Sequence, residues 1–224
     1  AAGSTRNFVY NHDNKLVLSD AGYGAIEYFY GPQSEKIAVL DNGRLTYTID
    51  PLIDIVNGQL SFNLQLAGHP LATYTSAEGI RYSVTDHLGS VRLVLDATQR
   101  VRKTLNYKPF GEIGSSSGDA VVERHNFNGN NQDSAGILDY NARSYDPRHG
   151  VFLQADNLVP DYLNPQSLNR YSYVLNNPLN LIDPSGHAPE DEEKENKTEE
   201  NAAADGTDQR TESSASSATT GNDQ

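Results

Sequence analysis

The sequence predicts a mainly β fold built from antiparallel hairpins and followed by a disordered tail. Short runs of apolar and aromatic residues alternate with clusters of turn residues, as in strands joined by tight turns. Glycine (18 residues) and tyrosine (13 residues) are abundant, and aromatic and β-branched residues favour strands. Outside the polar C-terminal part, no run of good helix formers carries an apolar stripe at helical spacing.

The first 80 residues read as a succession of short strands and turns. The fragments YNHDNKLV and LDNGRLTY repeat one pattern about 29 residues apart, and a repeat of that size cannot bury its apolar face alone. An ordinary β-meander with chance similarity is the alternative. The pair Asn42-Gly43 supplies the positive φ angles of a tight hairpin turn. The expected strands are 8–10, 15–18, 26–30, 36–40 and 44–49.

A clearer hairpin follows in residues 82–112. Residues 90–95 and 101–107 are expected to form its two main strands. His87 follows Asp86 in the preceding turn. No third partner stands nearby in the sequence, so we interpret His87 as a turn histidine bonded to the backbone and not as a metal or catalytic group.

Charge and composition exclude several classes of function. The net charge is −13, and residues 188–224 alone hold 11 acidic and 3 basic residues. The remainder shows no basic patch interleaved with aromatic residues, so we expect no nucleic-acid partner. Without cysteine the chain has no disulfide framework, thiolate nucleophile or zinc–thiolate site.

The sequence predicts neither a membrane span nor a secretory leader. No apolar run approaches the ~20 residues that a spanning helix needs. No signal-peptide pattern is recognisable. The chain starts without methionine and contains none, so we expect it to be a piece of a longer product or a processed form.

Four motifs follow one another in the second half of the chain. They are TDHLGSVRLVLD (85–96), YKPFGE (107–112), FNGNNQDSAGILDYNARSYDPRHGVFLQAD (127–156) and NPQSLNRYSYVLNNPLNLIDPSGH (164–187). In this order they resemble the RHS repeat-associated core domain, the C-terminal part of RHS/YD-repeat proteins. The resemblance covers roughly residues 82–187, and the preceding residues are more loosely similar to YD repeats. It implies a curved antiparallel sheet of β-hairpins that is part of a β-shell, which the core domain ends and plugs.

The resemblance divides the chain into YD-type hairpin repeats (1–81), an RHS core domain (82–187) and an acidic tail (188–224). The tail has no aromatic residue and no aliphatic residue larger than alanine, so we expect it to be disordered and without toxin chemistry. In the family a variable, often toxic polypeptide follows the core domain. The implied partners are upstream YD repeats or another shell-forming chain, and a C-terminal payload that is absent here.

The candidate site residues are Arg143, Asp156 and Asp183. We expect them to come together where the ordered part of the chain ends. Two carboxylic acids within ~3 Å can share one proton. The ionised acid would activate a water molecule, and the protonated acid would polarise a peptide carbonyl. An arginine nearby would orient a carboxylate through its planar fork.

The resemblance implies a role for the same three residues. Relatives release their C-terminal segment by aspartyl autoproteolysis, using an arginine in A-R-Y-Y-D-P, an aspartate thirteen residues later and a final D-P-x-G. Arg143 lies in ARSYDP, Asp156 follows thirteen residues later, and Asp183 begins DPSG. The implied cut falls at or near the His187–Ala188 bond, and neither a cofactor nor a metal is expected.

The assignment of the acids has alternatives. Asn157 and Val151 stand where the family has proline and arginine. Asp161 rivals Asp156, because its spacing of 22 residues to Asp183 matches many relatives.

A purely structural interpretation also remains open for these residues. Asp183 can open a type I turn, and Arg143 can simply pair and stack among tyrosines. We further expect a strand at residues 171–174, because Tyr-Ser-Tyr-Val suits an extended backbone.

Two functions are compatible with the sequence. One is a structural shell or carrier end-piece of an RHS-type polymorphic toxin that releases its C-terminal segment near His187. The alternative is a non-catalytic cell-surface adhesion or interaction module. With either function we expect the protein to be secreted or at the cell surface. A hydrolase for external substrates has little support, because none of the six histidines has triad or metal-ligand spacing. We expect an open sheet that exposes an apolar concave face and at least one edge.

Overall fold

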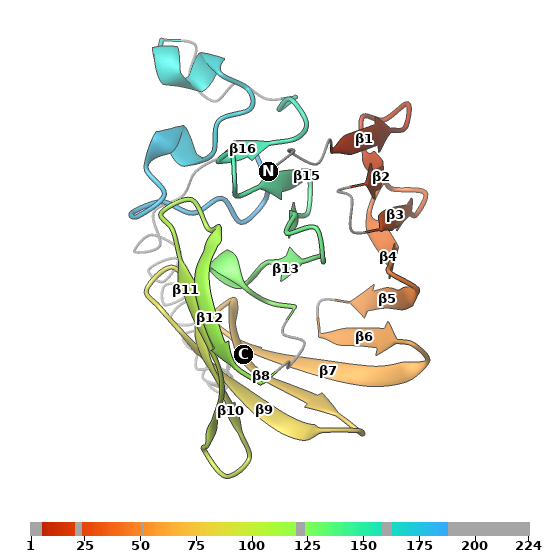
Figure 1. Ribbon diagram of the computed structural model, residues 1–224. Helices are drawn as coiled ribbons and strands as arrows, with labels where there is room; N and C mark the ends of the chain where they lie inside the picture. The colour runs from red at the N-terminus through yellow and green to blue at the C-terminus, as the bar shows by residue number, and fades with distance from the viewer. Residues whose placement is uncertain (1–5, 21–23, 51, 120–123, 158–162, 188–224) are drawn as a thin grey trace, which may run out of the picture. The chain divides into compact units, whose positions relative to one another are not determined.

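The computed structural model shows two antiparallel sheets (Figure 1). It describes residues 6–20, 24–50, 52–119, 124–157 and 163–187, all of which belong to one structural unit. The mainly β fold predicted from the sequence is confirmed. The described ranges contain no helix that could span a lipid bilayer.

The larger sheet follows the order of the chain. Each of its twelve described strands pairs with the next in antiparallel fashion, so hairpins alone build the sheet and no crossover is needed. The strands are β1 (Asn7–Tyr10), β2 (Leu16–Asp20), β3 (Ala25–Tyr30), β4 (Lys36–Asp41), β5 (Arg44–Asp50), β6 (Ile53–Val56), β7 (Gln59–Leu66), β8 (His69–Thr75), β9 (Gly79–Thr85), β10 (Val91–Asp96), β11 (Val101–Tyr107) and β12 (Ile113–Gly118).

Asn-Gly turns close two of these hairpins. Asn42 and Gly43 have φ angles of 50° and 78°, and Asn57 and Gly58 have φ angles of 50° and 80°. Two successive positive φ angles are the mark of a type I′ turn, whose twist matches that of the flanking strands. The hairpin turn predicted at Asn42-Gly43 is therefore confirmed.

The strands from β5 to β9 bury a polar face and expose an apolar one. On the buried face, Asn63 Nδ2 donates a hydrogen bond of 2.9 Å to Asp54 Oδ2, and Arg81 is also buried. Alternate residues of a strand point to opposite faces, so the intervening apolar side chains lie on the other side. The exposed apolar residues of these strands include Tyr47, Ile49, Leu60, Phe62, Leu64, Tyr74, Tyr82 and Val84.

The smaller sheet is formed by the C-terminal half. Its strands are β13 (Asn131–Gln132), β14 (Leu138–Tyr140), β15 (Arg143–Asp146) and β16 (Val151–Phe152). Three short 3₁₀ helices flank it: η1 (Phe127–Gly129), η2 (Pro165–Leu168) and η3 (Val174–Asn176).

An aromatic cluster forms the core of this half. Tyr140, Tyr145, Phe152 and Tyr173 are fully buried, with ring centroids 4.6 Å apart for the Tyr145–Tyr173 pair. The hydroxyls of Tyr140 and Tyr173 each donate a hydrogen bond of 2.8 Å to Asn128 Oδ1. These bonds satisfy phenol groups that would otherwise be buried without a partner.

The strand expected at residues 171–174 is wrong. Ser172 forms only an isolated bridge with Val151, and the helix η3 follows at once. Val174 and Leu175 have φ angles of 40° and 53°, which an extended strand does not allow. The ring of Tyr173 packs in the core, so this aromatic residue does not mark a strand.

Ion pairs and an apolar cluster join the first strands to the C-terminal half, and Figure 1 shows β15 near β1 and β2. Arg6 Nη1 lies 2.7 Å from Asp146 Oδ2, and Lys36 Nζ lies 2.9 Å from Asp139 Oδ2. The apolar cluster contains Leu16, Ile26, Tyr28, Ala135 and Ile137.

The domain boundary predicted after residue 81 falls inside β9, and the larger sheet continues through it. The acidic tail, 188–224, and Asp161 lie outside the described residues.

Candidate functional site

Arg143 begins β15, a strand whose four residues are all buried. Only 6% of Arg143 is exposed. Its guanidinium carbon lies 3.6 Å from the centroid of the Phe152 ring, which the neighbouring strand β16 supplies. A planar guanidinium stacks well on an aromatic face. Phe152 therefore fixes the plane in which Arg143 donates its hydrogen bonds.

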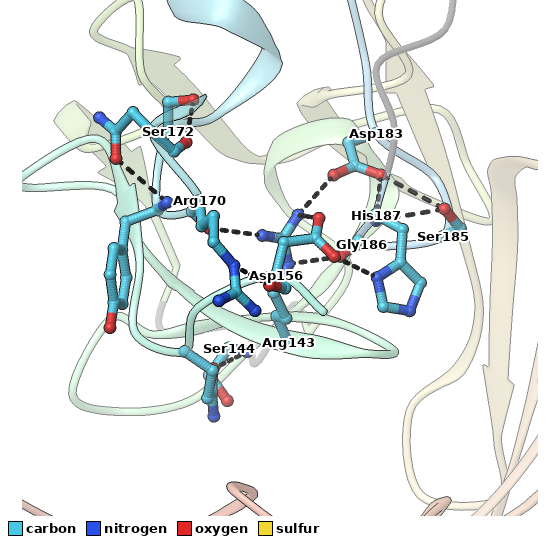
Figure 2. A network of polar contacts seen from close by, with 12 residues as sticks. Arg143, Ser144, Asp156, Arg170, Ser172, Asp183, Ser185, Gly186 and His187 are labelled. Atoms are coloured by element: carbon cyan, nitrogen blue, oxygen red, sulfur yellow. Dashed lines mark hydrogen bonds and ion pairs between the residues drawn. The ribbon is translucent and has the colours of Figure 1, made fainter. Parts of the chain in front are cut away.

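The two predicted acids meet at this guanidinium (Figure 2). Arg143 Nη2 lies 3.0 Å from Asp156 Oδ2 and 3.3 Å from Asp183 Oδ2. Asp156 and Asp183 are only 4% and 2% exposed. Because both oxygens contact the same nitrogen, the two carboxyl groups are close neighbours. The structure thus brings together the three residues that the sequence predicted.

The main chain at Gly186 and His187 closes the cluster. The His187 backbone N–H donates a hydrogen bond of 2.9 Å to Asp183 Oδ1, and its Nδ1 lies 2.9 Å from Asp156 Oδ1. Arg143 Nε donates a hydrogen bond to the Gly186 carbonyl. Each acid therefore has one oxygen on Arg143 and the other on His187, as Figure 2 shows.

Glycine is required at position 186. The φ angle of Gly186 is +77°, and a Cβ atom built there would collide with the backbone carbonyl of Tyr140. Any other residue would be strained and would push the segment away from Tyr140. The final glycine of the DPSG motif therefore lets the last turn approach the acids.

A small cavity adjoins the cluster. Its volume is about 30 Å³, enough for about one water molecule, and Arg143, Asp156, Asp183 and His187 lie in its wall. Arg170 forms another part of the wall and braces the site. The Arg170 carbonyl accepts hydrogen bonds from Arg143 Nη1 at 3.1 Å and from the Asp156 backbone N–H at 2.9 Å.

Burial and the two acids act in opposite directions on Arg143. Burial lowers the pKa of Arg143, while Asp156 and Asp183 raise it. A guanidinium nevertheless remains charged over the physiological range. The site therefore offers one fixed positive charge, two carboxyl groups and room for water, all beside a main-chain peptide.

Two residues of the site were missed in the sequence. His187 was noted only as the end of the ordered part, and Arg170 was not singled out. The sequence carried one signal for His187, namely its position directly after the DPSG motif. Arg170 contributes both its carbonyl oxygen, which no residue type can signal, and its side-chain Nε, which donates a hydrogen bond to the Asp156 carbonyl.

The rival assignments fare differently. Asp161 lies outside the described residues. The turn role of Asp183 exists together with the ion pair, since its Oδ1 accepts the backbone N–H four residues later. His87 is held as a turn residue, with Nε2 3.2 Å from the Leu179 carbonyl oxygen. Across the described ranges, no group of three or more histidine, aspartate or glutamate side chains could hold a metal ion.

A family comparison identifies the fold. The Teneurin YD-shell family matches residues 4–179, which is most of the chain. This chain belongs to the Teneurin YD-shell family. The resemblance to RHS/YD-repeat proteins is thereby confirmed.

Relatives by sequence are much longer proteins. The chain is 31% identical over 121 residues to the toxin subunit YenC1 of Yersinia entomophaga, covering 52% of this chain and 12% of the relative. It is 34% identical over 104 residues to the salivary gland surface protein 1 of Aedes aegypti, covering 45% and 3%. Teneurin-1 of Gallus gallus is 26% identical over 185 residues, covering 81% and 6%.

Solved structures share the fold. The crystal structure of TcdB2-TccC3 superposes with a TM-score of 0.69 at 20% identity, covering 83% of this chain and 10% of that one. The Tc holotoxin pore of Photorhabdus luminescens gives a TM-score of 0.67 at 21% identity, covering 84% and 10%. The YD-shell domain therefore corresponds to about a tenth of these chains.

Proposed function

We propose that this YD-shell domain is the end-piece of a toxin-type protein shell, and that it cuts its own chain at or near the His187–Ala188 bond. The observation that carries this proposal is the buried contact of Arg143 with both Asp156 and Asp183. The site adjoins the last described residue, so the main chain itself is the substrate within reach.

The chemistry is the hydrolysis of one peptide bond. An ionised acid of the pair takes a proton from a water molecule, whose oxygen attacks the carbonyl carbon of His187. The other acid, protonated, donates a hydrogen bond to the carbonyl oxygen. The bond to the nitrogen of Ala188 then breaks, and that nitrogen leaves with a proton. The products are a carboxylate on His187 and an amine on Ala188.

Arg143 has a positioning task in this scheme. Its Nη2 holds an oxygen of each acid, and its Nε holds the Gly186 carbonyl, one residue before the bond to be cut. A preorganised charge in a buried site stabilises the transition state more than the same charge in water would, because no solvent has to reorient.

The adhesion or interaction module is the second candidate. The salivary gland surface protein 1 of Aedes aegypti among the relatives favours it, since that protein is named for a surface. A module that only presents loops has no need for two buried acids on one arginine, however. The burial of Asp156 and Asp183 therefore supports self-cleavage more strongly.

Shell partners follow from the exposed faces of the sheet. Large apolar side chains on β5 to β9 lie open to solvent, and a further shell-forming segment or chain would cover them. The solved relative exists as the TcdB2-TccC3 assembly, which supports a shell-forming partner for this chain too. The same relatives support a secreted or cell-surface location. We further propose that the segment beginning at Ala188 occupies the position of the payload, as another structure of the assembly names a hypervariable C-terminal region.

Intact-mass measurement of the purified 224-residue chain tests self-cleavage. We expect two products, which end at His187 and begin at Ala188. Asp183→Asn should leave the chain whole, because the amide keeps the shape but cannot act as an acid. Asp119→Asn is the matched control, since the exposed Asp119 pairs with Arg102 and does not line the cavity of the site. A chain that stays whole without any substitution, or an Asp183→Asn chain that is still cut, rules self-cleavage by this site out.

A further inference from the structure

His187 holds an unusual position in the cluster, because it touches both acids with two different groups. Its backbone N–H bonds to Asp183 Oδ1, and its imidazole Nδ1 lies within hydrogen-bond distance of Asp156 Oδ1. Both distances are 2.9 Å. A residue with an aliphatic side chain would make the first contact and not the second.

We infer that His187 is a positioning residue that pins the polypeptide in register, so that the bond after it, and no neighbouring bond, is presented to the acids. The inference rests on the proposed self-cleavage and adds what selects the bond. Reacting groups must be held in a near-attack arrangement, and a misplacement of about 1 Å can cost on the order of 100-fold in rate.

The contacts on either side show why a pin is needed. Gly186 is held by Arg143 Nε, but glycine has no side chain that could fix its direction. Ser185 Oγ lies 3.5 Å from Asp183 Oδ1, at the limit of a hydrogen bond. Among the side chains of residues 184–187, the imidazole of His187 is therefore the one that holds the segment to Asp156.

The groups facing the imidazole are all fixed by other contacts. Asp156 is anchored by Arg143 at 3.0 Å and by its backbone N–H to the Arg170 carbonyl. Asp183 is anchored by the same Arg143. The ring of His187 thus meets a rigid partner, and its side chain remains 31% exposed on the other side. Asp156 thus offers a fixed acceptor, and the His187 imidazole is the group on the segment to be cut that contacts it.

Substitution by an amide separates hydrogen bonding from mere bulk. Asparagine places its side-chain nitrogen close to where histidine has Nδ1, so His187→Asn can keep the bond to Asp156. His187→Leu fills similar space and cannot bond. We expect His187→Asn to cut at the same bond within about threefold of the original rate. We expect His187→Leu to lose about tenfold or more, and to give additional products with shifted termini.

A second histidine provides the control. His149 Nδ1 lies 2.8 Å from Asp146 Oδ2, a similar pair outside the cavity wall. His149→Leu should change neither the rate nor the mass of the products. Near-ultraviolet circular dichroism of the tyrosine core, recorded for every variant, checks that each one folds.

Amide hydrogen exchange at residue 187 gives a readout that needs no cleavage. The backbone N–H is held by Asp183, so exchange should be slow in the original chain and in His187→Asn, and about tenfold faster in His187→Leu. If the original chain is never cut, the proposed function fails and the selection of a bond fails with it, and exchange then shows only whether the imidazole holds residue 187 in place. If the chain is cut and His187→Leu gives the same single product at the same rate, the register role is refuted while self-cleavage stands.

Discussion

Removing the charge of Arg143 should destabilise the fold more than most single substitutions. Arg143→Met leaves Asp156 and Asp183 buried and opposite each other without the guanidinium that contacts both. Breaking a buried ion pair from one side costs about 3–5 kcal/mol, because the remaining charge is neither solvated nor paired. Methionine keeps much of the contact with Phe152, so the loss is mainly electrostatic.

The cost can be read in thermal unfolding. For a domain of this size, 1 kcal/mol corresponds to about 2–4 °C in Tm, so Arg143→Met should lower Tm by about 6–20 °C. Near-ultraviolet circular dichroism follows the melting of the buried tyrosines. Arg143→Lys keeps a positive charge without the planar fork and should lose less.

A triple variant supplies the decisive comparison. Arg143→Met combined with Asp156→Asn and Asp183→Asn contains no charge in the cluster, so most of the lost stability should return. If Arg143→Met alone unfolds at the original temperature, or if the triple variant is no more stable than the single one, the cluster is not an electrostatic unit.

Three further predictions concern buried titratable groups elsewhere in the fold and the packing of the site. Burial raises the pKa of Asp133 to about 6 and lowers the pKa of His125 to about 4. Between pH 4 and 6 the folded chain therefore binds more protons at Asp133 than the unfolded chain does, and fewer at His125. As the pH rises, the contribution of Asp133 to the free energy of unfolding falls and the contribution of His125 rises. The free energy of unfolding, measured by denaturant titration at several pH values between 4 and 6, should rise more steeply with pH for Asp133→Asn than for the original chain. For His125→Gln it should fall as the pH rises. Parallel curves for the three proteins would contradict both assignments. Gly186→Ala should slow self-cleavage at least tenfold, whereas Gly43→Ala, with a similar φ of +78° and no atom within 4 Å of a new Cβ, should cut normally. Equal cleavage in both would exclude the close approach at Gly186. Phe152→Ala should cost about 3–5 kcal/mol in urea unfolding and Phe152→Leu markedly less, because the ring is 1% exposed and carries Arg143. A near-zero loss for alanine would contradict that packing.

The sequence revealed local structure and motif spacing more readily than the way the segments close on each other. Hairpin turns such as Asn42-Gly43 were predictable, since glycine and asparagine tolerate the required φ angles. The strand expected at 171–174 was wrong, because aromatic residues mark a core as readily as a sheet.

Which groups meet at the site was only partly predictable. Arg143, Asp156 and Asp183 were singled out through the resemblance to the family's motifs, in which an aspartate follows the arginine by thirteen residues and another opens the final turn, and this assignment left Asp161 as a rival. The contact between His187 and Asp156 joins residues 31 positions apart and depends on the turn at Gly186, so neither residue type nor local pattern announces it. The sequence predicted that the sheet would expose an apolar face, but not that the polar face of β7 and β9 would be covered.

The most direct test of the central claim compares the two rival acids. The masses of the 224-residue chain are measured side by side for Asp156→Asn and Asp161→Asn. If Arg143, Asp156 and Asp183 form the cleaving unit, Asp156→Asn remains whole, and Asp161→Asn is cut after His187 like the original chain. The opposite pattern, with Asp156→Asn cut and Asp161→Asn whole, would contradict the account.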